Sequence, residues 1–303
     1  MSGIVAPSVA SPARVAGFTG LALLAFAGNS ILCRGALGAG TVDPDPFTWT
    51  RLTSGAAMLA ILARLGPQRR IVGDPRGDVS IQDLTPRGPW PGAIALTLYA
   101  ATFSWAYVRI PAGVGALVLF AATQATMIGW AFWKGERPRG TELLGIAIAL
   151  LGLLGLASPG RTAPDLVGVA LMAIAGSAWG VYSLLGKGAL EPVASNAAAF
   201  GRSALLATLL LGLAPLPRPF PVRAGVLAVL SGALASAVGY SLWYAALPHL
   251  SRTRAAALQL TVPVIAALAG IVLLNEPATL RLLASGAVIL GGVALSLVGR
   301  ARA

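Results

Sequence analysis

Eight polar or aromatic side chains lie within long apolar stretches of the chain, where they could bind a small molecule. They are Asn29, Tyr99, Gln124, Trp179, Tyr182, Ser236, Tyr240 and Gln259. A side-chain amide is costly to expose to lipid, so these groups are expected to face protein or a water-filled cavity. Amides and hydroxyls can hydrogen-bond a polar ligand, and aromatic faces attract an ammonium group. The set favours a small zwitterion over a strongly anionic sugar phosphate.

The same side chains also have a structural interpretation, in which the amides tie helices together and the rings fill the core. The sequence leaves this alternative open for each of the eight. Six further aromatic residues fall toward the ends of the apolar stretches and are predicted to anchor the chain at a membrane interface. They are Trp105, Tyr107, Trp130, Trp133, Trp243 and Tyr244.

Ionisable residues are nearly absent from the middle of the apolar stretches, where such groups are functional candidates. Glu136 and Glu276 precede predicted helix starts, where the helix dipole favours a carboxylate. Helix capping is therefore the preferred interpretation of both, ahead of proton coupling. Arg51 is interpreted as an interfacial charge. Arg202 either extends to the interface or meets a substrate carboxylate.

The residue pattern contains no constellation typical of catalysis. The apolar stretches lack paired carboxylates, metal-ligand spacing and a serine with a histidine partner, so an enzyme, a cofactor and a metal site are not expected. Cys33 is the single cysteine, which excludes an intrachain disulfide. Small residues one turn apart, Gly145 with Ala149 and Ala287 with Gly291, predict close helix packing.

Ten apolar ranges are long enough to cross a bilayer core of about 30 Å as helices. The 303 residues are 56% hydrophobic and only 11% charged, with a mean hydropathy of +0.80, which is too few charges for a water-exposed surface. The net charge of +12 is not attributed to nucleic-acid binding, because the basic residues lie in short gaps where they can meet lipid headgroups. The expected helices are 15–33, 47–65, 91–108, 112–133, 140–157, 166–186, 195–214, 222–246, 254–274 and 279–298.

Most of the 22 lysine and arginine residues fall in gaps on one side, if the N-terminus is cytoplasmic. The positive-inside rule then predicts that both termini are cytoplasmic. The stretch that begins at Arg14 also has features of a signal peptide. We expect it to be retained as a helix, because an internal repeat needs it.

That repeat relates the two halves of the chain. Aligning Glu136 with Glu276 places a proline and a Gly-rich helix after both residues. Each half then holds five helices, and the odd number makes the second half enter the membrane in the opposite orientation. The pattern predicts two inverted repeats, residues 1–160 and 161–303, with a substrate site between them. Chance similarity among Gly-, Ala- and Leu-rich helices is the alternative.

The half-motifs resemble the EamA repeat of the drug/metabolite transporter superfamily. They read Gly135-Glu136-Arg137-Pro138 and Asn275-Glu276-Pro277, supported by Thr261-Val262-Pro263. The resemblance covers residues 15–298 and is greatest to the YddG-type amino-acid exporters. It implies that the first, third, fourth, sixth, eighth and ninth helices line a cavity, with the fifth and tenth at the periphery. The first copy departs from the pattern, with Thr123-Gln124 where the second has Pro263-Val264.

We therefore expect an all-α membrane protein that exports amino acids or similar small zwitterionic metabolites across the bacterial inner membrane by alternating access. The lack of a carboxylate in the middle of the membrane favours facilitated efflux over tight proton coupling. The expected partners are a small-molecule substrate and the lipid bilayer; monomer and homodimer both stay open. Two alternatives remain: a transporter of a cationic drug or a nucleotide sugar, and a membrane-embedded binding or assembly protein without a transport cycle.

Overall fold

The computed structural model describes residues 11–65, 90–135, 140–158, 163–186, 192–210, 220–250 and 258–301. Within these ranges every regular element is a helix, as the sequence predicts. The elements are α1 Pro12–Leu37, α2 Pro44–Leu65, α3 Trp90–Arg109, α4 Ala112–Trp133, α5 Gly140–Ala157, α6 Leu166–Leu185, α7 Pro192–Leu210, α8 Val222–Val229, η2 Leu230–Val238, α9 Gly239–Ala246, η3 Leu247–His249, α11 Thr261–Leu274 and α12 Leu280–Ala301. Because α8, η2 and α9 follow one another without a break, they form one long helix, Val222–Ala246.

Each of the ten predicted apolar ranges contains a helix. Parts of two of them, 211–214 and 254–257, lie outside the described residues. Helix starts follow the expected local chemistry. The Ser11 hydroxyl accepts a hydrogen bond from the Arg14 backbone N–H at 3.3 Å, just before the proline that begins α1. Asp165 caps α6 in the same way, accepting from the Gly168 N–H at 2.7 Å.

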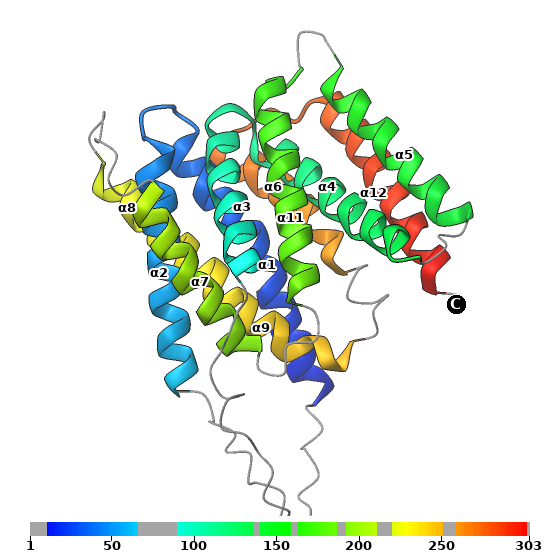
Figure 1. Cartoon of the computed structure of the whole chain (residues 1–303). Helices are drawn as coiled ribbons and strands as arrows, with labels where there is room; N and C mark the ends of the chain where they lie inside the picture. Colours follow the sequence, from blue (N-terminus) through cyan, green and yellow to red (C-terminus); the bar gives the residue numbers. More distant parts are fainter. Residues whose placement is uncertain are drawn as a thin grey trace, which may run out of the picture.

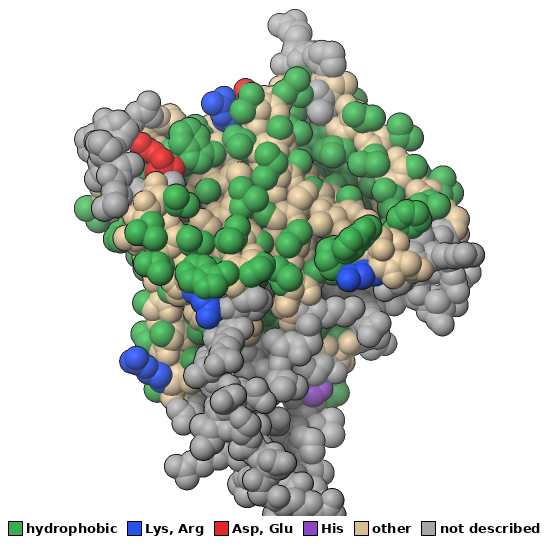
Figure 2. Space-filling model, in the orientation of Figure 1, with side chains coloured by type: hydrophobic (Ala, Val, Ile, Leu, Met, Phe, Trp, Pro, Cys, Tyr) green, Lys and Arg blue, Asp and Glu red, His purple; other side chains and the backbone are tan. Residues whose placement is uncertain are grey.

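The outer surface of the helix bundle is hydrophobic. Five helices are long and apolar enough to cross a bilayer: α1, α4, α6, the Val193–Leu210 part of α7 and the long helix Val222–Ala246. Leu154 of α5 and Val272 of α11 are 67% and 72% exposed. Figure 2 shows hydrophobic side chains spread across the visible face, with few charged groups among them. Such a surface suits contact with lipid tails.

Contacts between the two halves of the bundle occur in matching pairs. The contact of α3 with α6 matches that of the long helix Val222–Ala246 with α1; α4 with α6 matches α11 with α1; and α2 with η2 matches α7 with α3. In each match, every helix is replaced by the one five places away in chain order. Figure 1 shows α5 beside α12 at one side of the bundle, with α2, α7 and α8 at the other.

Small residues bring α5 and α12 into backbone contact. A Cβ added to Gly145 would lie 2.5 Å from the Gly292 carbonyl oxygen, and one added to Gly292 would lie 2.5 Å from the Ala149 nitrogen. The roles of Gly145 and Ala149 agree with the sequence prediction. The prediction of close packing at Gly291 is wrong, because a Cβ there would meet nothing within 4 Å, and the neighbouring Gly292 makes the contact instead. Neighbouring helix positions point about 100° apart, so an error of one residue selects a different face.

The long helix Val222–Ala246 contains a π-helical segment, η2. Such segments are rare and frequently occur at functional sites. Gly232 of η2 lies directly against α2, where a Cβ would collide with the carbonyl oxygen of Arg51 and the hydroxyl of Ser54. Glycine at this position therefore lets η2 press against the turn of α2 that carries Arg51.

Of the six aromatic residues predicted at the interface, three are exposed, two are buried, and Tyr244 is half-buried and packs against the hydrophobic core. Trp105, Trp130 and Trp133 are exposed, as an interfacial role requires. Tyr107 and Trp243 are buried, so the prediction is wrong for both. The two rings belong to the hydrophobic core because their helices turn them inward. Closeness to a helix end does not determine which face a ring occupies.

Candidate functional site

A small cavity, called the central cavity below, lies among helices from both halves of the chain. Its volume is about 40 Å³, and it is lined by Phe26, Asn29, Ser30, Tyr99, Phe103, Leu119, Phe120, Trp179, Ala235, Tyr240 and Gln259. These residues belong to α1, α3, α4, α6, η2, α9 and the segment before α11. In chain order they are the helices that the family resemblance implies. The volume is enough for a few water molecules and is smaller than a typical ligand site, so a substrate would require the helices to separate.

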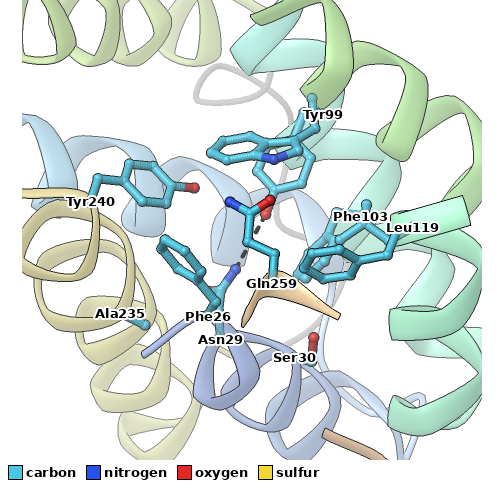
Figure 3. Close-up of a pocket in the computed structure, with 11 residues that line it drawn as sticks. Phe26, Asn29, Ser30, Tyr99, Phe103, Leu119, Ala235, Tyr240 and Gln259 are labelled. Carbon is cyan, nitrogen blue, oxygen red and sulfur yellow. Dashed lines mark hydrogen bonds between the residues drawn. The ribbon is translucent and has the colours of Figure 1, made fainter. Parts of the chain in front are cut away.

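Five of the eight predicted site residues line this central cavity: Asn29, Tyr99, Trp179, Tyr240 and Gln259. Figure 3 shows the side chains of Tyr99, Tyr240, Asn29 and Gln259 around a common space. They come from segments far apart in the sequence, so the bundle as a whole assembles the site. Amide and phenol groups meet aromatic faces there, which is the combination that the residue types predict.

A chain of hydrogen bonds fixes the polar side of the central cavity. The Asn29 amide donates to the Tyr99 hydroxyl at 3.3 Å, and its oxygen accepts from the Ser231 hydroxyl at 2.6 Å. The Arg51 guanidinium donates to the same Tyr99 hydroxyl at 3.0 Å. Arg51 of α2 and Ser231 of η2 therefore orient Tyr99 and Asn29. Neither Arg51 nor Ser231 lines the central cavity itself.

Aromatic rings form the other side of the central cavity. The centroid of Trp179 lies 5.1 Å from that of Tyr99 and 5.1 Å from that of Tyr240. Phe26 lies 5.7 Å from Tyr240. These separations are typical of favourable tilted aromatic pairs. The ring faces can receive an ammonium group or an apolar side chain.

Two further predicted residues support the lining from behind. Tyr182 is buried against Trp179, with ring centroids 5.5 Å apart, and its hydroxyl donates to the Asn196 side-chain oxygen at 2.5 Å. Ser236 is buried beside Tyr240, and its hydroxyl makes no hydrogen bond of normal geometry within the described residues. Neither residue lines the central cavity itself.

Gln124 faces a different space. It lines a second cavity of about 410 Å³ between α4, α5, α6 and α12. Its neighbour Thr123 points toward α6, where its hydroxyl donates to the Gly176 carbonyl at 3.0 Å. The structure therefore does not bring Gln124 together with the five residues of the central cavity.

Comparison with known proteins identifies the family. A model of the EamA-like transporter family matches residues 166–298. Over a wider range the chain is 30% identical to a Streptantibioticus cattleyicolor protein named "probable terminal-alkyne amino-acid exporter", across 251 residues and 81% of each chain. The chain belongs to the EamA-like transporter family.

Other relatives agree with this EamA-family assignment. A Pseudomonas aeruginosa protein is 49% identical over 283 residues, covering 93% of this chain and 94% of that protein. A Salmonella typhimurium protein named "probable amino-acid metabolite efflux pump" is 28% identical over 67% of this chain and 75% of its own. A solved crystal structure has the same fold, with a TM-score of 0.64 at 23% identity over 96% of this chain and 99% of that one. The protein is thus a multi-pass membrane transporter and not an enzyme.

This EamA-family protein has a second polar cluster, called the end cluster below, where α1 and α3 end and α4 begins. The Arg34 guanidinium lies 3.0 Å from the Glu276 carboxylate and donates to the Tyr107 carbonyl at 2.8 Å. The carboxylate also accepts from the Ala112 backbone N–H at 2.8 Å. Glu276 therefore caps a helix, as predicted, but the helix is α4 rather than the following α12. Glu136, its counterpart in the first half, lies outside the described residues.

Sequence reasoning misjudged Arg51 of this transporter. The side chain is 2% exposed, so its interpretation as an interfacial charge is wrong. The predicted helix began at residue 47, whereas α2 begins at Pro44, which moves Arg51 deeper into the helix. Its occurrence in an apolar helix was itself the signal of a functional group. Arg202 instead stacks over Trp90, the first residue of α3, at 5.6 Å, and does not line the central cavity.

Proposed function

We propose that this protein is a secondary transporter that exports amino acids or similar small zwitterionic metabolites by alternating access through the central cavity. The observation that carries the proposal is the composition of the lining, where Asn29, Tyr99 and Gln259 lie opposite the rings of Trp179 and Tyr240. Such a lining can accommodate an ammonium group, a hydrogen-bonding group and an apolar side chain at once. The names of two relatives, one an amino-acid exporter and one an amino-acid metabolite efflux pump, support the same substrate class.

The proposed architecture is ten membrane-spanning helices in two inverted repeats, residues 1–160 and 161–303. The matching contacts between the halves support it, because an exchange of helices five places apart is what a twofold axis in the membrane plane would produce. The central cavity takes lining residues from both proposed repeats. Rocking of one repeat against the other would then expose the cavity alternately to the two sides.

The proposed location is the bacterial inner membrane, with both termini in the cytoplasm as the positive-inside rule predicts. Facilitated efflux down a gradient is the proposed energetic mode. No carboxylate lines the central cavity among the described residues, and a carboxylate there would be the expected proton carrier of a proton-coupled transporter.

Flux of radiolabelled amino acids in proteoliposomes tests the proposal. A panel of neutral, aromatic, basic and acidic amino acids would be run with the wild type, Trp179→Ala and Trp130→Ala. Trp179 lines the central cavity, whereas Trp130 is exposed on the outer surface, so it is a matched control. We expect saturable flux that falls about tenfold or more in Trp179→Ala, because the cavity loses a central ring, and stays within about twofold in Trp130→Ala.

Absence of flux for every amino acid, with protein shown to be folded and inserted, would refute the proposed substrate class. The assay would be repeated with and without a pH gradient. Flux that ignores the gradient supports facilitation, and flux that accelerates with the gradient contradicts it.

A further inference from the structure

Arg51 is a charge buried inside the bundle without a carboxylate partner among the described residues. It is the eighth residue of α2 and only 2% exposed. The described ion pairs join Arg34 with Glu276 and Arg109 with Asp165, and neither involves Arg51. A buried charge is costly unless it is paired, so a lone guanidinium at this depth requires an explanation.

The groups around the Arg51 guanidinium are neutral. One of its nitrogens donates to the Tyr99 hydroxyl at 3.0 Å, and another lies 4.0 Å from the Cys33 sulfur. The guanidinium also lies over the rings of Tyr99 and Phe103, at 5.2 and 4.9 Å from the centroids. These contacts orient the positive charge but do not neutralise it. Its field therefore extends toward the central cavity, which Tyr99 and Phe103 both line.

Tyr99 connects this charge to the central cavity. A phenol hydroxyl has one proton to donate and two lone pairs that accept. The Tyr99 oxygen already accepts from Arg51 and Asn29. Its own proton has no acceptor among the described residues, so it remains available to a ligand in the cavity. A cationic donor to the same oxygen polarises the hydroxyl and makes it a stronger donor.

We infer that Arg51 is a positioning residue for a substrate carboxylate: it holds Tyr99 as a donor toward the central cavity and supplies the positive field that an anionic group requires. This inference rests on the proposed function and narrows its substrate class. A transported molecule carries a carboxylate toward Tyr99 and an amine or apolar group toward Trp179 and Tyr240. A cationic drug without a carboxylate is disfavoured, because its charge would meet the field of Arg51 uncompensated.

The test is competition against the flux of labelled phenylalanine in proteoliposomes. Unlabelled phenylalanine and unlabelled phenylalaninamide, in which a neutral carboxamide replaces the carboxylate, would be compared by the concentrations that halve the flux. In the wild type we expect the amide to require at least tenfold more than the acid. In Arg51→Met the flux should fall at least tenfold, and the amide-to-acid ratio of the residual flux should approach one.

Three further variants separate positioning from folding. Tyr99→Phe keeps the ring but removes the hydroxyl, so it should lower the ratio as Arg51→Met does. Arg51→Lys keeps the charge and should retain an intermediate ratio. Arg202→Gln removes another arginine from a helix, one that stacks on Trp90 outside the cavity lining, and should leave flux and ratio unchanged. A general loss of packing would lower flux without changing which of two competitors is preferred.

Two outcomes would overturn the inference. The first leaves the proposed transport function intact, and the second overturns that function as well. A wild type that transports phenylalanine saturably but does not distinguish it from the amide, or an Arg51→Met variant that keeps the wild-type ratio, refutes the role of Arg51 alone. A wild type that moves no amino acid refutes the proposed function and the inference together. Should Arg51→Met fail to fold, Tyr99→Phe and Arg51→Lys decide the question by the same ratio.

Discussion

Two arginines in the apolar interior of this transporter have opposite surroundings. Arg34, near the end of α1, pairs with Glu276 at 3.0 Å and donates to a backbone carbonyl of α3. Arg51, within α2, contacts a phenol hydroxyl and two rings, with no carboxylate partner in the described parts of the chain. The charge of Arg34 is thus neutralised by a carboxylate, whereas the contacts of Arg51 orient its charge without neutralising it.

The difference indicates two roles for the same side chain. The charges of Arg34 and Glu276 hold together the segments that meet at the end cluster. Removal of one partner therefore leaves the other charge unpaired and poorly solvated. Arg51 has no oppositely charged partner among the described residues. An apolar side chain of similar size can therefore replace it without leaving an unpaired ion. We therefore expect substitutions at the end cluster to act mainly on stability, and substitutions of Arg51 to act mainly on transport.

The largest effect on stability is expected at the end cluster. Glu276→Ala removes both the partner of Arg34 and the cap on Ala112, and Glu276 is only 10% exposed. Loss of one member of a fully buried pair typically costs about 3–5 kcal/mol, and the loss here should be smaller because the pair is only partly buried. We expect a clear fall in the apparent melting temperature of the purified protein in detergent.

Glu276→Gln sharpens this result, because the amide oxygen can still accept from the Ala112 N–H while the ion pair is lost. A smaller loss in Glu276→Gln than in Glu276→Ala would separate the cap from the pair. Adding Arg34→Gln to Glu276→Gln should restore part of the stability, since the two side chains are coupled. Strictly additive losses would show that the pair contributes no coupling.

The second expected effect is that Arg51→Met leaves the melting temperature unchanged or raises it. Replacement of a buried charge by an apolar side chain is often neutral or stabilising. The measurement is the same thermal unfolding in detergent, beside Glu276→Ala. A melting temperature that falls as far in Arg51→Met as in Glu276→Ala would make Arg51 a structural residue and remove the contrast between the two arginines.

The smallest effect is expected for Gln124→Ala. Gln124 lines the second cavity rather than the central one, so its amide should not meet the substrate. We expect amino-acid flux within about twofold of the wild type, because no transition-state contact is lost. A tenfold loss in the proteoliposome assay would move the transport route toward the second cavity.

The sequence alone predicted the helices well because hydropathy depends only on which residues follow one another. It also selected Asn29, Tyr99, Trp179, Tyr240 and Gln259, since polar groups in apolar helices need a polar surrounding. It could not separate Gln124 from these five, because the face on which a side chain lies depends on how each helix is rotated in the bundle.

Contacts between distant segments were equally hidden from the sequence. Glu276 precedes α12 in the chain, yet the N–H that it caps belongs to α4, more than 160 residues away. Ser231 was missed because a serine in an apolar helix commonly bonds its own helix backbone, whereas this one donates to Asn29 of α1. Both contacts are products of tertiary packing that no local pattern reports.

The π-helical segment η2 sets the direction of the residues that follow it in the long helix Val222–Ala246. A π turn bonds residues five apart in the chain where an α turn bonds residues four apart, and each extra residue shifts the later positions by about 100° around the axis. Tyr240 and Trp243 follow η2 and depend on that shift for their direction. Deleting one residue from Leu230–Val238 would therefore turn both rings to another face. The length of this segment thus decides whether Tyr240 reaches the central cavity.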